Sequence, residues 1–212
     1  MELHVLRVFV DGDDRHGNPL GVVLDGPSVP ADARQPLAAE LGYSETVFVD
    51  DRERGAIRIF TPATELAFAG HPTVGTGWLL GADSLAPPAG DVRVRRDGDL
   101  TWVAARPEWA PPFRHVELGS PGAVDAHPIP AAGADAVWAW EGDGRVRSRV
   151  FAADYGIDED EATGAAALRL GALLEQPIRI RQGRGSVIHV RPRADGFVEV
   201  GGRVVLDTVI ER

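Results

Sequence analysis

The sequence contains no cysteine among its 212 residues. This absence excludes disulfides, zinc–thiolate sites, iron–sulfur clusters and every mechanism that uses a thiol. No apolar run approaches the length that a membrane span needs. The opening segment 1–4 has no basic region followed by an apolar core, so we expect no signal peptide and a cytoplasmic location.

Positive charge is scarce relative to negative charge. The chain has 22 Lys and Arg against 32 Asp and Glu, which gives a formal net charge of −10. This balance argues against a nucleic-acid or anionic-membrane partner. It does not exclude a small anionic substrate, because a nearby helix end outweighs a distant surface charge. The length and composition are those of one sizeable globular domain or two small ones.

Several common site motifs are also missing. The chain has no dinucleotide-binding fingerprint and no Gly-x-Ser-x-Gly nucleophile elbow. The segment 70–76 resembles a phosphate-binding loop in spacing but lacks the required lysine. Five histidines show no metal-ligand pairing, namely His4, His16, His115, His127 and His189. The residues therefore predict neither a nucleotide site nor a metal site.

The segment 65–78 organises the first half of the chain. It consists of an apolar strand end, a glycine turn at Gly70 and a helix that begins at His71-Pro72 and ends at Gly81. Proline is tolerated in a first helical turn, where its missing N–H has no partner to lose. The N-terminus of such a helix suits a carboxylate or phosphate. The alternative is a helix that packs on a sheet and binds nothing.

The remaining pattern predicts many short strands and two further helices. Strands are expected near 3–10, 21–24, 43–49, 56–60, 92–94, 100–103, 137–140, 146–151, 178–180, 187–190, 197–200 and 204–206. Helices are expected from about residue 30 to Gly42, with Leu37 and Leu41 on one face, and over 162–174. Prolines and glycines fill 107–135, which we expect to be a linker or irregular cover. The domains would then be 1–106 and 136–212 on either side of it.

The two halves of the chain show the same order of predicted elements. Each half contains strands, then an acidic stretch, then a small-residue helix opened by a glycine, at 69–71 and at 162–164. We therefore predict an α+β fold of two similar halves. Two helix N-termini would face each other across a cleft and hold one anionic ligand there.

Three residues are candidates for proton chemistry. Glu45 lies among apolar residues, and burial raises a carboxyl pKa towards the range of a general acid/base. His71 could move a proton, and Asp160 precedes the second helix. The alternatives are a solvated glutamate, a structural histidine and an aspartate that stabilises a helix dipole.

Two turns are candidates for ligand contacts. Asn18 either turns the chain or aims its amide into a site. The segment Gly183–Ser186 either binds an anion through backbone N–H groups or forms a hairpin turn.

Taken together, the motifs resemble those of the PhzF family of phenazine-biosynthesis-like isomerases. The resemblance runs through 17–25, 44–48, 57–63 and 65–75, which is nearly the whole first half. It implies a fold similar to that of diaminopimelate epimerase, in which each half is a sheet rolled around a central helix. It also implies a homodimer that needs neither metal nor organic cofactor.

The resemblance assigns roles to matching positions. Glu45 matches the acid/base, and Gly70 and His71 match a substrate-contacting Gly-His-Pro element. Asp160, Thr163 and Gly164 match a second motif, in which Glu161 replaces a proline and Ala165 replaces a substrate-contacting serine. A later substrate-binding segment survives as 182–186, with Gly183 and Ser186. The second half is shorter than is usual in the family.

These observations predict a cofactor-independent isomerase or epimerase that moves a proton between carbons of a small carboxylate-bearing metabolite. Glu45 would move the proton, assisted by His71 and Asp160. Two alternatives remain open. One is a non-catalytic protein that binds a small ligand in the same cleft. The other is a cyclase or hydrolase that uses the same acid/base.

Overall fold

In the computed structural model, which describes residues 1–211, the first half of the chain forms a twisted sheet. Its strands are β1 (Glu2–Val10), β2 (Asn18–Val23), β3 (Glu45–Asp51), β4 (Ala56–Phe60) and β5 (Glu65–Leu66), in the spatial order β5-β4-β3-β2-β1. Strands β2 and β3 are parallel, whereas their neighbours pair antiparallel. The sheet continues into the last strand, β15 (Val198–Glu211), which pairs with β1.

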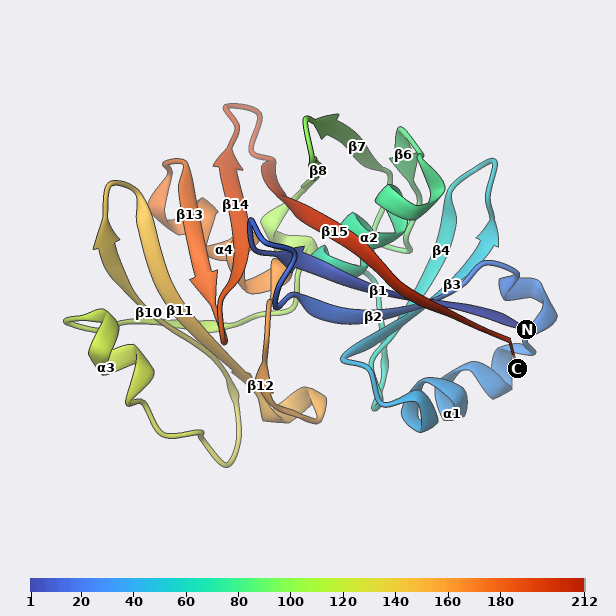
Figure 1. Cartoon of the computed structure of the whole chain (residues 1–212), viewed down its shortest axis with the longest axis horizontal. Coiled ribbons are helices and arrows are strands. Elements are labelled where there is room, and N and C mark those ends of the chain that lie inside the picture. Colours follow the sequence, from blue (N-terminus) through green and yellow to red (C-terminus); the bar gives the residue numbers. More distant parts are fainter. Residues whose placement is uncertain (212) are drawn as a thin grey trace.

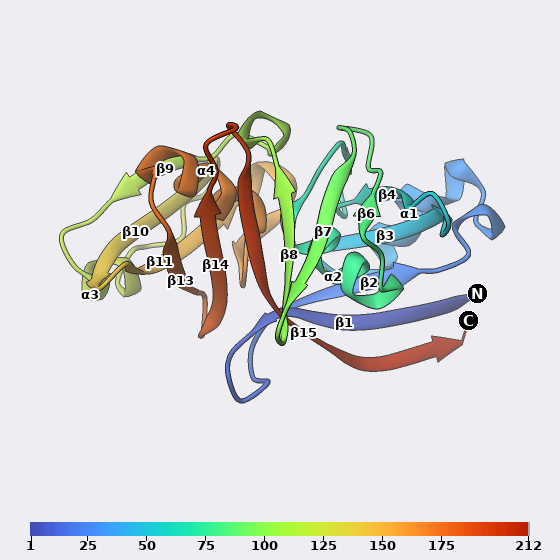
Figure 2. The same ribbon diagram turned by 90° about the horizontal axis from the view of Figure 1, so that it is seen from above.

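A second sheet surrounds the other half of β15. Its path is β9 (Arg114–Glu117), β10 (Ala134–Gly142), β11 (Arg145–Ala152), β13 (Ile178–Gln182), β14 (Ser186–Pro192), β15, β8 (Leu100–Ala105), β7 (Val92–Asp97) and β6 (Ser84–Leu85). The short β12 (Ile157–Asp160) pairs with β11. Strand β15 therefore belongs to both sheets: residues 198–202 lie between β14 and β8, and residues from 203 onward pair with β1 (Figure 1). The two chain ends consequently lie side by side (Figure 2).

Each half of the protein wraps its strands around one central helix. Helix α2 (Gly70–Leu80) packs against β1, β2, β8 and β15, and α4 (Gly164–Leu174) packs against β14 and β15. Most residues of both helices are buried, which fits their small and apolar sequences. The predicted α+β plan of two similar halves is confirmed. Helix α2 ends at Gly81 as expected, where φ is 62° and glycine adopts the left-handed conformation without strain.

A separate helix, α1 (Ala31–Leu41), covers the outer face of the first sheet. Leu37 and Leu41 pack there on a buried cluster that includes Phe48 and Phe60. The shared face predicted for these two leucines is confirmed. Within residues 1–211, no helix is both long and apolar enough to cross a bilayer.

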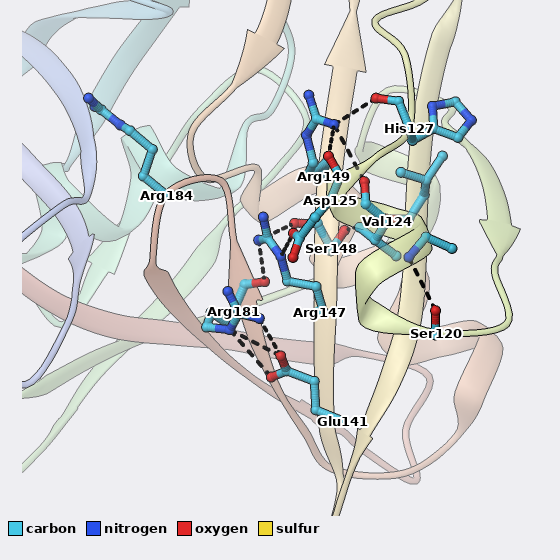
Figure 3. Close-up of polar contacts among 12 residues, drawn as sticks. Ser120, Val124, Asp125, His127, Glu141, Arg147, Ser148, Arg149, Arg181 and Arg184 are labelled. Carbon is cyan, nitrogen blue, oxygen red and sulfur yellow. Dashed lines mark hydrogen bonds and ion pairs between the residues drawn. The ribbon is translucent and has the colours of Figure 1, made fainter.

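The proline-rich passage 107–135 is partly regular. It contains β9, which pairs parallel with β10, and the short helix α3 (Pro121–Asp125). Two arginines of β11 fix it to the sheet (Figure 3). Arg147 Nε donates to Asp125 Oδ1 at 2.7 Å, and Arg149 Nη1 donates to the carbonyl oxygen of His127 at 2.7 Å. The passage is thus a docked layer over the second sheet.

Candidate active site

Asn18 and Glu45 lie at the same edge of the first sheet. Each is the first residue of its strand, β2 and β3, and the parallel pairing sets Leu20 opposite Glu45. Parallel strands that begin together present their first side chains to one region. Ser44 Oγ donates to Asn18 Oδ1 at 3.1 Å. The glutamate and the asparagine that the sequence singled out separately are therefore neighbours.

The two central helices meet at their N-termini. A Cβ atom added to Gly70 would lie 2.7 Å from Gly164 Cα, and one added to Gly164 would lie 2.7 Å from the backbone nitrogen of His71. The helix ends thus touch directly instead of facing each other across open space. The first N–H groups of a helix have no partner within it, so both ends offer donors beside this contact.

Asp160 accepts hydrogen bonds from both halves of the chain. Asn18 Nδ2 donates to its Oδ1 at 2.7 Å, and Thr163 Oγ1 donates to its Oδ2 at 2.6 Å. Gln182 Nε2 donates to the Asp160 carbonyl oxygen at 2.9 Å and to Thr163 Oγ1 at 2.9 Å. These four side chains are buried, so the network orients the Asp160 carboxylate rigidly.

Glu45 lies against His71. Its Oε2 is 3.3 Å from His71 Nδ1, and both side chains are buried. Burial lowers the pKa of His71 to about 3, so the imidazole is neutral and the contact is not an ion pair. Glu45 Oε2 has no hydrogen-bond partner. A buried polar atom without a partner is rare in folded proteins, and a ligand at this position would supply the missing hydrogen bond.

The Glu45 and Asp160 carboxyl groups interact electrostatically, and both have raised pKa values. Burial, reinforced by the charge of Asp160, raises the pKa of Glu45 to about 8. Burial raises the pKa of Asp160 to about 6, against the hydrogen bonds from Thr163 and Asn18. Near neutral pH the pair therefore shares one proton, because two adjacent buried charges repel each other. This arrangement gives Glu45 the proton affinity of a general acid/base.

A small cavity opens onto these groups. It has a volume of about 30 Å³, and Glu45, Asp160, Thr163, Ala69 and Ala165 line it. Ala69 and Thr163 precede α2 and α4, which places both helix ends at the cavity. A larger hollow of about 390 Å³ lies elsewhere and contains none of the residues singled out from the sequence.

Gly183 and Ser186 do not line this cavity. They belong to the turn between β13 and β14, where Ser186 Oγ donates to Glu161 Oε1 at 2.8 Å. The backbone nitrogen of Arg184 donates to both Glu161 oxygens at 3.1 Å. The anion held by this turn is thus the chain's own carboxylate. Direct contact of Gly183 and Ser186 with a substrate stays a prediction.

Several cavity-lining residues had no signal in the sequence, among them Pro111, Phe113 and Tyr155. Pro111 and Phe113 come from the proline-rich passage, and Tyr155 follows β11. The rings of Phe113 and Tyr155 are 6.2 Å apart between centroids. Only the tertiary fold brings these side chains over Glu45. Gln182, by contrast, belongs to the motif segment 182–186, so its place near the site could have been predicted from the sequence.

Two sheets that each enclose a helix, with a buried acid pair where the helices meet, define an epimerase-like α+β protein. The sequence model of the phenazine biosynthesis-like protein family, PhzC-PhzF, matches residues 8–103. A trans-2,3-dihydro-3-hydroxyanthranilate isomerase from Pseudomonas fluorescens is 33% identical over 224 aligned residues, covering 79% of this chain and 80% of that protein. This chain belongs to the PhzC-PhzF family.

Solved structures agree with this assignment. A putative phenazine biosynthesis PhzC/PhzF protein from Clostridium difficile superposes with a TM-score of 0.83 at 20% identity, covering 100% of this chain and 99% of that one. A predicted epimerase from Pseudomonas aeruginosa superposes with a TM-score of 0.78 at 25% identity, covering 100% of this chain and 98% of that one. The fold is therefore that of PhzF-like and epimerase-like proteins.

Proposed function

We propose that this protein is a cofactor-independent isomerase that moves a proton between two carbons of a small carboxylate-bearing metabolite. The observation that carries the proposal is the buried Glu45 carboxyl group. The pKa of this group is raised to about 8, and its Oε2 has no hydrogen-bond partner in the protein. The group lines the cavity at which both central helices begin. The isomerase names of the Pseudomonas relatives support the same reaction class.

In the proposed reaction, backbone N–H groups at the starts of α2 and α4 bind the substrate carboxylate. The ionised fraction of Glu45, whose pKa of about 8 lies close to neutral pH, removes a proton from one carbon, and the electron pair of that C–H bond moves through an adjacent carbon–carbon double bond of the substrate towards the carboxylate. The helix N–H groups stabilise the charge that develops there. Glu45 then returns the proton to the carbon at the far end of the shifted double bond, so that double bond has changed place and the enzyme ends in its initial state. Asp160 keeps the Glu45 proton affinity high, and His71 orients the glutamate or the substrate.

The test is proton exchange with solvent. Wild-type protein in deuterated water is expected to exchange a carbon-bound proton of at least one member of a panel of small cyclic and amino carboxylic acids. The panel includes trans-2,3-dihydro-3-hydroxyanthranilate, and loss of the proton signal is followed by NMR. Glu45→Gln preserves shape but removes the base, so exchange should cease. Glu53→Gln, an exposed change of the same kind, should leave exchange intact.

One observation favours a second function. The absence of a hydroxyl at Ala165, where the related motif carries a substrate-contacting serine, fits a protein that binds a small ligand without turnover. Such a protein would bind members of the panel in calorimetry but would incorporate no deuterium. Equal exchange by wild type and Glu45→Gln would overturn the mechanism itself. The homodimer implied by the family resemblance stays a prediction, which light scattering tests directly.

A further inference from the structure

A second carboxylate, that of Glu161, follows the cavity-lining Asp160 in the chain and takes no part in the proposed reaction. Its side chain is only 14% exposed. Its oxygens accept hydrogen bonds from the backbone nitrogen of Arg184 at 3.1 Å and from Ser186 Oγ at 2.8 Å. Arg184 Nε lies 3.3 Å from Oε2. The turn between β13 and β14 thus forms a fitted cradle for this one carboxylate.

The cradle is connected to the other half of the protein. Ser186 is completely buried, and its Oγ accepts a hydrogen bond from the backbone nitrogen of Gly17 at 2.9 Å. Gly17 itself has little freedom, because its φ is 83° and a Cβ atom there would lie 2.7 Å from Val10 Cγ1. A continuous chain of hydrogen bonds therefore runs from Glu161 through Ser186 to the turn that precedes β2.

The next residue in that turn is Asn18, whose amide holds the pocket carboxylate. Asn18 Nδ2 donates to Asp160 Oδ1 at 2.7 Å and to the carbonyl oxygen of Ala162 at 2.9 Å. Asp160 therefore holds Asn18 directly, and the next residue, Glu161, holds Gly17 through Ser186. Because hydrogen bonds weaken steeply when distance and angle change, a shift of Gly17 disturbs the Asn18–Asp160 contact.

We propose that Glu161 is a positioning residue for Asp160. Its carboxylate, fixed in the 183–186 turn, holds Gly17 and Asn18 in register with Asp160, and so sets the charge that Glu45 experiences. The backbone N–H of Arg184 and the hydroxyl group of Ser186 contribute more to this role than the Arg184 side chain does. Arg184 is 80% exposed, and an exposed ion pair of this kind contributes little. Its backbone N–H remains when the side chain is removed.

The experiment compares Glu161→Ala, Glu161→Gln and the matched control Arg184→Ala. Amide hydrogen exchange of Gly17, measured by NMR, is expected to be up to about tenfold faster in Glu161→Ala. Formate is expected to slow that exchange again, because it fills the vacated cradle. Arg184→Ala should match wild type. Glu161→Gln keeps an acceptor for Ser186 but loses the charge, so it should lie between the two and should not respond to formate.

A second measurement links the cradle to the site and rests on the proposed function. Glu161→Gln removes the charge of Glu161, a charge that adds to burial in raising the pKa of Asp160, and Glu161→Ala removes the support of the Asn18 hydrogen bond as well. Loss of that hydrogen bond favours protonation of Asp160 and so weakens the charge that adds to burial in raising the pKa of Glu45. The acid limb of the proton-exchange profile, which follows ionisation of Glu45, should therefore lie at lower pH in Glu161→Ala than in Glu161→Gln. A purely structural Glu161 would lower stability without moving that limb and without rescue by formate. Unchanged Gly17 exchange in Glu161→Ala, or an equal effect of Arg184→Ala, would overturn the proposal. Absence of any substrate exchange in wild type would instead count against the isomerase, and the Gly17 measurement would still decide this inference.

Discussion

Gly70 and Gly164 meet backbone to backbone where helices α2 and α4 begin. A Cβ atom added to Gly164 would lie 2.7 Å from the amide nitrogen of His71, a distance that real Cβ contacts do not show. The two glycines therefore serve the contact between the halves of the protein, and they bring both helix ends to one side of the cavity. Neither could be replaced without separating the helices.

We expect Gly164→Ala to destabilise the protein by about 1–3 kcal/mol, because overpacking forces the backbone apart. Substrate proton exchange should fall as well, since His71 moves with α2. Urea unfolding measures the first effect. Gly122→Ala, at the exposed start of α3, is a suitable control because the nearest atom to its added Cβ is 3.9 Å away. Equal stabilities of Gly164→Ala and wild type would contradict the close contact.

The buried acid makes stability depend on pH. Burial raises the pKa of Glu45 from 4.5 to about 8, so the folded protein retains a proton that the unfolded chain releases. The stability contributed by protonated Glu45 is full below about pH 4.5 and is lost as the pH rises through about 8. The pKa of Asp160 is raised to about 6, so this group also makes the folded protein less stable as the pH rises, over a lower pH range.

Glu45→Gln should flatten this decline. The variant cannot ionise at position 45, so its free energy of unfolding relative to wild type should grow as the pH rises from about 5 to about 8. Unfolding in urea at a series of pH values provides the measurement. Glu53→Gln changes an exposed glutamate and should leave the difference from wild type constant. Parallel curves for wild type and Glu45→Gln would show that Glu45 is not protonated in the folded state.

Asn18 offers a test of the hydrogen bonds around Asp160. Asn18→Asp replaces the donating amide with an oxygen that accepts only, next to the Asp160 carboxylate and the Ala162 carbonyl. We expect a loss of about 1–3 kcal/mol in unfolding free energy from the unpaired acceptors. The pKa of Asp160 should rise further, because a like charge replaces a donor. Carboxyl-carbon NMR over a pH series measures that pKa, and an unchanged titration of Asp160 would contradict the role assigned to Asn18.

The sequence predicts the central elements well because their signals are local. The glycine and proline at the start of α2 and the αL glycine at its end fix that helix from within. The placement of Glu45, His71, Asp160, Asn18, Gly70, Thr163 and Gly164 around one junction rests on the family resemblance and on the repeated plan of the two halves. Local spacing alone left each of these residues with a structural alternative.

The elements of the proline-rich passage 107–135 could not be predicted from local sequence signals. Ser120 and Pro121 begin α3, and Ser120 Oγ accepts from the backbone nitrogen of Ala123 at 3.2 Å. This is a recognisable helix start that the surrounding prolines obscure. Strand β9 has four residues with little alternation, and its pairing with β10 determines it. Its neighbours Pro111 and Phe113 line the cavity, and Arg169 of α4 also holds this stretch by donating to the carbonyl oxygen of Ala110 at 3.1 Å.

Ala165 provides a test of substrate preference. It lines the cavity at the start of α4, at the position where the related motif carries a serine. Ala165→Ser adds one hydroxyl to a wall that already holds the Glu45 and Asp160 carboxyl groups. One new hydrogen bond to a polar substrate contributes about 0.5–1.5 kcal/mol, so kcat/KM for such a substrate should rise about two- to tenfold.

The matched variant for this test is Ala165→Gly, which gives up a methyl group and adds no donor. Its kcat/KM should not rise for any member of the panel. The ratio between hydroxylated and non-hydroxylated carboxylic acids is the decisive measurement, because a general change in cavity size affects both classes alike. An identical ratio in Ala165→Ser and wild type would show that this wall does not contact the polar part of the substrate. Recognition would then rest on the helix N-termini and the acid pair alone.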